Sequence, residues 1–267
     1  MKPTNEEFPS ALESIFLVIG LYAAEYVAGA ALLDFRSLSG IDRRDIDGVV
    51  AVLGSGVLFS ALLYYKRMTY ASLFHPSSNS VAATVGTLTV PVLLIVPGLT
   101  LAVWTMQALL VSAFPLSSWH QAMFERMMSN GLASVVTACI LAPVLEEMLF
   151  RGIILRSFLR QYRRSHAIVG SAALFGLAHL NIYQFAVGLA LGIVSGWLYE
   201  RARSLWPCIL LHAAYNGVVV WAYVSIGAID QNDIWLPPTA FWVALFVLTF
   251  VGVSLLQRLL ASPRETT

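Results

Sequence analysis

The chain has 267 residues, of which 58% are hydrophobic and only 12% are charged, and its formal net charge is +1. A soluble domain carries about 25% charged residues, so this composition excludes a large soluble domain. The small net charge also excludes an overall basic surface, and we expect no nucleic-acid partner. The two cysteines, Cys139 and Cys208, lie in apolar stretches and predict neither a disulfide framework nor a metal-binding pair.

Eight apolar runs follow one another along the chain. They are Ile15–Leu33, Gly48–Tyr65, Val81–Phe114, Leu132–Phe150, Ala167–Leu180, Ile182–Leu198, Leu205–Ile229 and Phe241–Leu260. A spanning helix needs about 20 such residues, because the hydrocarbon layer of a bilayer is about 30 Å thick. Backbone groups in that layer must pair with one another, which favours helices. The sequence therefore predicts an all-α, polytopic transmembrane helix bundle of about eight spans.

The third run, Val81–Phe114, is the longest. As one helix it would extend about 51 Å, which is too long for one upright span and short for two. Pro91 and Pro97 predict a kink within it. Large apolar residues recur at roughly helical spacing after this run, which fits a short interfacial helix or an ordinary loop. These residues are Trp119, Met123, Met127 and Met128.

The positions of the arginines predict the orientation of the second half, because cytoplasmic loops are enriched in lysine and arginine. One side carries Arg156, Arg160, Arg163, Arg164, Arg201, Arg203, Arg258 and Arg264, whereas the other carries only Arg126. We therefore expect the arginine-rich side and the C-terminus to be cytoplasmic, in a bacterial cytoplasmic (inner) membrane. The first half shows no such bias. If the third run is a single span, both termini lie inside.

A few ionisable and amide side chains interrupt the apolar runs. A charge at this depth costs about 2.5–3.5 kcal/mol on insertion scales, so such residues usually face the protein interior and have a function. They are Glu25, Glu146, Glu147, Arg151, His179, His212 and Asn216. Glu25 stands alone, without a motif or an obvious partner. A structural hydrogen bond or a lumen-facing role is favoured for it over catalysis.

The remaining six residues are spaced so that they can converge. Glu147 and Arg151 are four residues apart and can pair on one helix face, as can His212 and Asn216. Glu146 is rotated by about 100° from Glu147, toward a different neighbour. Helical rise places Glu146, His179 and His212 about 13–20 Å deep in the bilayer. The sequence thus predicts a carboxylate, two imidazoles and an amide at similar depth on three helices.

These residues form three motifs in chain order. Residues 146–151 read E-E-x-x-x-R, residues 175–179 read F-x-x-x-H, and residues 212–216 read H-x-x-x-N on a helix that opens with Trp206-Pro207. Together they resemble the CPBP family of intramembrane proteases, which includes the CAAX prenyl endopeptidases. The resemblance covers Leu132–Val220, and residues 1–120 show none. It implies a catalytic four-helix core at 131–225, preceded by a transmembrane region at 1–130. A loop, a last transmembrane helix and a tail follow at 226–267.

The resemblance also implies roles for the motif residues. Glu146 and His179 are expected to activate water, and His212 and Asn216 to stabilise the tetrahedral oxyanion. Glu147 and Arg151 are expected to support the site. The implied activity is an intramembrane endopeptidase that acts at the lipid bilayer on a peptide or protein with a hydrophobic or lipidated segment.

Three alternatives stay open. A zinc ion held by Glu146, His179 and His212 would give a metallopeptidase, although no H-E-x-x-H motif is present and a metal-free glutamate mechanism is favoured. Glu and His residues at mid-membrane also occur in proton-coupled transporters, but the chain shows no internal repeat. A non-catalytic immunity or scaffold protein with the same fold is the third alternative.

Overall fold

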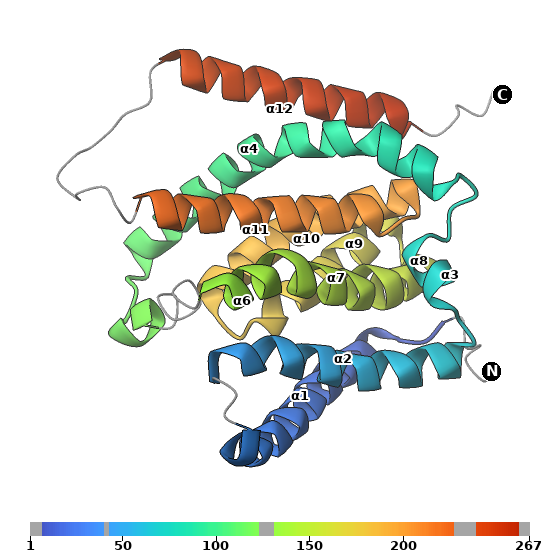
Figure 1. Cartoon of the computed structure of the whole chain (residues 1–267). Coiled ribbons are helices and arrows are strands. Elements are labelled where there is room, and N and C mark those ends of the chain that lie inside the picture. Colours follow the sequence, from blue (N-terminus) through green and yellow to red (C-terminus); the bar gives the residue numbers. More distant parts are fainter. Residues whose placement is uncertain (1–6, 40–42, 123–130, 227–238, 262–267) are drawn as a thin grey trace.

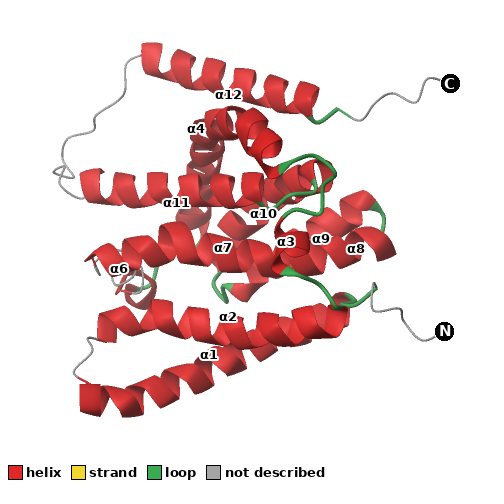
Figure 2. Cartoon of the chain, turned by 45° about the vertical axis from the view of Figure 1, so that its right-hand side comes forward, coloured by secondary structure: helices red, strands yellow, loops and turns green. Residues whose placement is uncertain are grey.

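The computed structural model describes residues 7–39, 43–122, 131–226 and 239–261, and every regular element in these residues is a helix (Figures 1 and 2). The N-terminal half contains α1 (Ala11–Ser39), α2 (Arg43–Lys66), α3 (Tyr70–Phe74) and α4 (Val81–Ala113). One long segment then combines α6 (Gly131–Val136), η1 (Thr137–Leu141), α7 (Ala142–Glu147), η2 (Met148–Leu155) and α8 (Arg156–Gln161), where η1 and η2 are π-helical. The remaining helices are α9 (Arg164–Ala178), α10 (Ile182–Ala202), α11 (Trp206–Ile226) and α12 (Thr239–Leu259).

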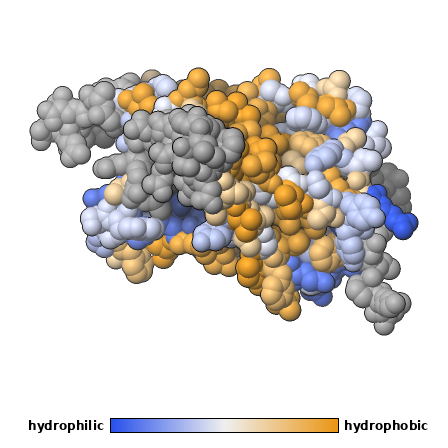
Figure 3. Space-filling view, turned by 60° about the horizontal axis from the view of Figure 1, so that its bottom comes forward, coloured by the Kyte–Doolittle hydropathy of each residue, from blue (hydrophilic) through white to orange (hydrophobic). Residues whose placement is uncertain are grey.

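Seven helical segments in the described residues are long and apolar enough to cross a membrane. They are Ala11–Leu32, Gly48–Lys66, Val81–Ala113, Gly131–Gln161, Ile182–Ala202, Trp206–Ser225 and Thr239–Leu259. The remaining predicted run, Ala167–Leu180, falls in α9, whose 15 residues extend only about 22 Å. Apolar side chains cover the middle of the face in Figure 3, and hydrophilic ones gather toward its ends. The prediction of an all-α, multi-pass membrane bundle is confirmed.

The third run forms the single long helix α4, with Pro91 and Pro97 in its interior. Figure 1 shows α4 as an arch rather than a straight rod, as expected where proline removes a backbone hydrogen bond. After α4, residues 118–122 are helical and include Trp119. The predicted interfacial positions Met123, Met127 and Met128 lie outside the described residues, so the choice between a helix and a loop there stays open.

The helices are arranged around the segment from α6 to α8 and the helices α9, α10 and α11. On one side α4 packs against α10 and α11, and α12 packs against α4; on the other side lie α1 and α2 (Figure 1). Both described chain ends lie at the end of the bundle where the arginines gather. Gln161 donates a hydrogen bond to the Pro9 carbonyl (3.0 Å), and the end of α12 lines a hollow together with Arg201 and Arg203.

One ion pair at this end joins two antiparallel helices: Arg164 at the start of α9 lies 2.7 Å from Glu200 near the end of α10. Of the arginines used to predict orientation, Arg126 and Arg264 lie outside the described residues. The structure therefore gathers most of the predicted cytoplasmic arginines on one side of the bundle. Which side of the membrane this is remains a prediction.

Close packing of α9 against α10 sets the position of the turn between them. A Cβ atom on Gly188 would lie 2.9 Å from the Cα of Gly176, and one on Gly176 would lie 2.6 Å from the Phe185 carbonyl oxygen. Such small residues let helix backbones approach one another inside membranes. The turn itself contains Leu180 at φ 52°, in the left-handed region, and Asn181, whose side chain caps α10. His179 immediately precedes this tightly held turn.

Candidate active site

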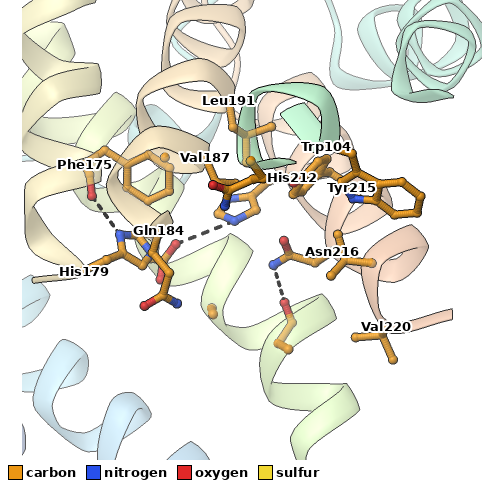
Figure 4. A pocket seen from close by; sticks show the side chains of 16 residues that line it. Trp104, Phe175, His179, Gln184, Val187, Leu191, His212, Tyr215, Asn216 and Val220 are labelled. Carbon is orange, nitrogen blue, oxygen red and sulfur yellow. Dashed lines mark hydrogen bonds and ion pairs between the residues drawn. The ribbon is translucent and has the colours of Figure 1, made fainter. Parts of the chain in front are cut away.

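Three helical segments bring the predicted residues to one place near the middle of the bundle. Glu146 and Glu147 end α7, His179 caps the C-terminus of α9, and His212 and Asn216 lie on α11. Figure 4 shows His179, His212 and Asn216 directed toward one cavity from two of these segments. The π-helical segments η1 and η2 flank α7 on both sides; such segments are rare and often occur at functional sites.

Glu147 is the centre of a buried ionic network. One of its carboxylate oxygens, Oε1, accepts a hydrogen bond from Arg151 Nη1 (3.0 Å) and lies 3.0 Å from Nδ1 of His212. Glu147 is 0% exposed and Arg151 is 1% exposed. The carboxylate therefore fixes the orientation of the His212 ring, and the predicted Glu147–Arg151 pair is present.

Glu146 faces the same imidazole from its other edge: its Oε2 lies 3.7 Å from His212 Nε2. Glu146 and Glu147 thus share the His212 imidazole, although Glu147 also pairs with Arg151 and only Glu146 borders the cavity. Successive side chains on a helix diverge by about 100°. An imidazole has a nitrogen on each of two edges, so one ring can meet both carboxylates. The Glu146 side chain is 31% exposed, because it borders a cavity.

His179 is oriented by its own helix. Its Nδ1 lies 2.9 Å from the carbonyl oxygen of Phe175, which can only accept, so Nδ1 carries the proton of that hydrogen bond. In a neutral ring, Nε2 then presents a lone pair. Nε2 is the nitrogen that can accept a proton or a hydrogen bond from water in the cavity.

Phe175 packs among the charged and polar groups. Its ring meets the rings of His179 and His212 edge-on, with centroids 5.2 and 5.6 Å away. The guanidinium carbon of Arg151 lies 4.6 Å from the Phe175 centroid, within range of a cation–π interaction. Phe175 therefore packs at the point where both imidazoles and the arginine converge.

Asn216 joins α11 to the π-helical segment η1. Its Nδ2 donates a hydrogen bond to the carbonyl oxygen of Ala138 (2.7 Å). An amide nitrogen carries two protons, so a second N–H is left for a ligand. The resemblance implied that this amide stabilises the oxyanion, and the bond to Ala138 gives it a structural role as well.

The predicted residues share a cavity of about 410 Å³, whose wall includes Glu146, His179, His212 and Asn216. Two further helices complete the wall: α4 contributes Trp104 and Gln107, and α10 contributes Gln184 and several apolar residues. Gln107 also donates to the Tyr183 carbonyl (3.0 Å), which ties α4 to the start of α10. Sequence reasoning missed these three residues. The two glutamines could have been found, because they are polar residues within apolar runs, as the histidines are.

Comparison with known proteins agrees with this geometry. Residues 128–218 match the family described as type II CAAX prenyl endopeptidase Rce1-like. A Bacillus subtilis (strain 168) protein described as "Putative membrane peptidase YdiL" is 29% identical over 86 residues, which is 32% of this chain and 35% of that protein. This segment is similar to the CAAX proteases. The resemblance inferred from the three motifs is thereby confirmed.

The matched segment, residues 128–218, contains every motif residue, but it is only part of the chain. The match spans about a third of the length of the Bacillus subtilis protein. Helices α1, α2, α4 and α12 lie outside residues 128–218. No solved structure gives a significant match. The comparisons thus support a membrane protease in general terms and leave the catalytic residues and the substrate to be argued from the geometry.

The metal-dependent alternative requires Glu146, His179 and His212 to be placed so that they can hold one zinc ion. Among the described residues, no group of three or more His, Cys, Asp or Glu side chains is placed to hold a metal ion. Of the expected donors only His212 Nε2 and Glu146 Oε2 lie together, 3.7 Å apart, while Glu147 holds the other nitrogen of His212 at 3.0 Å. The expected set of Glu146, His179 and His212 therefore does not fit a zinc site in this arrangement, and no step is derived through a metal.

Proposed function

We propose that this protein is an intramembrane endopeptidase that hydrolyses a peptide bond of a membrane-associated substrate by a glutamate-dependent, metal-free mechanism. One observation carries the proposal. A partly exposed carboxylate, Glu146, and an oriented imidazole, His179, line one cavity inside a membrane-spanning bundle. Water activation requires a base and a second polar group beside a space that admits the substrate.

In the proposed reaction, Glu146 takes a proton from a water molecule that hydrogen-bonds to Nε2 of His179. The water oxygen attacks the carbonyl carbon of the scissile peptide bond. Negative charge develops on the carbonyl oxygen, where the free N–H of Asn216 and Nε2–H of His212, when it is protonated, can donate hydrogen bonds. The C–N bond then breaks, and the proton passes from Glu146 to the departing nitrogen.

Glu147 and Arg151 are positioning residues in this mechanism. They do not line the cavity, whereas His212 does. Because Glu147 Oε1 lies 3.0 Å from His212 Nδ1, it holds the ring so that Nε2 points toward Glu146. Orientation of a catalytic imidazole by a buried carboxylate is a recurring arrangement in hydrolases.

The lining of the cavity indicates the substrate class. Trp104, Leu191 and Val219 are among its apolar members, while its polar members include Glu146 and both histidines. The proposed substrate is therefore a peptide or protein with a hydrophobic or lipidated segment, which enters from the cytoplasmic side or laterally from the bilayer. Binding of that segment in the apolar part of the cavity would position the peptide bond over Glu146.

The test uses the Glu146→Gln variant in proteoliposomes, with a mixture of membrane-anchored peptides whose products are identified by mass spectrometry. Loss of a general base costs about 10²–10⁴-fold in rate, so cleavage by the variant should fall by at least that factor. Undiminished cleavage by the variant would refute the role of Glu146 as the base, whereas no cleavage by the unmodified protein would refute the peptidase assignment and favour a scaffold role. Glu13→Gln, which changes a carboxylate at the start of α1 outside the cavity, is the matched control.

A second arm repeats the assay with the unmodified protein after treatment with a strong chelator. A metal-free mechanism predicts an unchanged rate. Loss of activity that zinc restores would replace the glutamate mechanism with a metal-dependent one, and would leave the peptidase assignment intact.

A further inference from the structure

A second, smaller cavity lies against Glu146 and His179. Its volume is about 150 Å³, and its wall is formed by α1, α2, α7, η2 and the end of α9. Four residues line both this cavity and the larger one: Ala142, Glu146, Phe175 and His179. The proposed water-activating residues therefore stand at the boundary between two spaces, one large and one small.

Helix α1 contributes Tyr22 and Glu25 to the small cavity. The Tyr22 hydroxyl donates a hydrogen bond to the carbonyl oxygen of Ala178, the residue that precedes His179. Glu25 packs closely on α2, since a Cβ atom on Gly54 would lie 2.5 Å from its Cγ. These two contacts fix α1 beside the active site and direct a carboxylate into the cavity.

Two polar side chains of the small cavity, Glu25 and Ser55, have no partner among the described residues, unlike Tyr22, Glu146 and His179. Within the part of the chain that the structure describes, the Glu25 carboxylate makes no hydrogen bond or ion pair, nor does the hydroxyl of Ser55, which lines the same cavity and is 2% exposed. The single proton of the Tyr22 hydroxyl is used in its hydrogen bond to the Ala178 carbonyl oxygen. A carboxylate is costly at this depth unless a donor satisfies it, so the cavity is suited to a ligand rich in N–H groups.

Building on the proposed function, we infer that this space is an amine subsite, lined by Tyr22, Glu25 and Ser55, which holds the half of the substrate that departs as an amine. Hydrolysis converts R–CO–NH–R′ and water into R–COO⁻ and R′–NH₃⁺. The new ammonium group is a donor without acceptor capacity, which complements the Glu25 carboxylate. Glu25 is therefore a specificity-determining residue, and the larger cavity holds the other half of the substrate.

The amine subsite lies on α1 and α2, outside the matched residues 128–218. The charged group that selects the departing half thus comes from a part of the chain that the family match does not reach. Its small volume restricts the first residue of the departing half to a short side chain.

The test measures binding, which requires no turnover. Two probes are used with the full chain in lipid nanodiscs: an apolar tetrapeptide amide that begins with alanine and has a free amino group, and its N-acetylated form. Isothermal titration calorimetry should show about tenfold tighter binding of the free-amine form by the unmodified protein, the size expected for a hydrogen bond to a charged group. Glu25→Gln should reduce this preference to less than twofold, and Glu25→Asp should retain most of it.

Glu13→Gln, which removes a carboxylate from the same helix away from the cavity, should keep the full tenfold preference. Equal binding of the two probes by the unmodified protein, or an undiminished preference in Glu25→Gln, would overturn the amine subsite. Neither result depends on cleavage. Continued cleavage by Glu146→Gln would instead overturn the proposed function, so the two failures are distinguishable.

Discussion

The Glu147 carboxylate uses one oxygen for two partners, Arg151 Nη1 and His212 Nδ1, each at 3.0 Å. Its other oxygen, and the second terminal nitrogen of Arg151, have no hydrogen-bond partner among the described residues. A buried pair of this kind adds little net stability, because desolvation offsets the attraction, but removal of one partner leaves an unpaired buried charge. The network is therefore best explained as a device that orients His212.

This reasoning predicts that Arg151→Met lowers the free energy of unfolding by about 3–5 kcal/mol, because Glu147 loses its counter-charge in a site that is 0% exposed. The double variant Glu147→Gln/Arg151→Met should lose much less than the two single changes together, since no charge is left unpaired. Thermal and denaturant unfolding in detergent micelles measure both effects. Arg164→Met, which breaks a partly exposed pair, should change stability by less than about 1 kcal/mol. Additive losses in the double variant would contradict the explanation.

At the scale of the elements, the contact between α9 and α10 determines where His179 lies. The backbones approach so closely at Gly176 and Gly188 that a Cβ on Gly188 would lie 2.9 Å from a backbone atom, which cannot move aside as a side chain can. Gly188→Ala is therefore predicted to lower the free energy of unfolding by about 1–3 kcal/mol and to reduce cleavage by displacing the turn at His179.

Gly86→Ala in α4 is the matched control, because no atom lies within 4 Å of the added Cβ. There the change should be neutral or stabilising by up to about 1 kcal/mol, because alanine favours a helix over glycine. Thermal unfolding and cleavage rates of the two variants are compared in the same detergent. If Gly188→Ala behaved like Gly86→Ala, the close approach would not control the site.

At the scale of the whole molecule, the bilayer itself made much of the fold predictable. Apolar runs long enough to span it became helices, and polar residues in those runs, such as Glu146 and His212, lie beside a cavity. Their catalytic roles stay predictions. Spacing did not indicate the amine subsite, because the approach of Glu25 depends on how α1 rotates and docks. It also did not predict that Glu146 and Glu147 share one imidazole, since that depends on the position of a third helix.

The path of the chain predicts how the bundle is oriented in the membrane. The described residues nearest both ends lie with the arginine-rich side of the bundle, and α4 carries the chain from that side to the other over about 50 Å. Ser78 precedes α4 beside Arg201 and Arg203, whereas Ser118 follows it, and both are exposed. Because arginine-rich segments stay in the cytoplasm, Ser78 should be cytoplasmic and Ser118 should face outward.

Cysteine labelling in intact cells measures this directly. With Ser118→Cys, a membrane-impermeant maleimide should label the protein in intact cells above the level of the unmodified chain, whose own thiols lie within helices of the bundle. With Ser78→Cys, labelling should rise only after the membrane is permeabilised. The opposite pattern would invert the bundle and place the chain ends outside. Because the two positions flank one helix, labelling of both in intact cells would show that α4 does not cross the membrane. The 33-residue length and apolar character of α4 argue against that result.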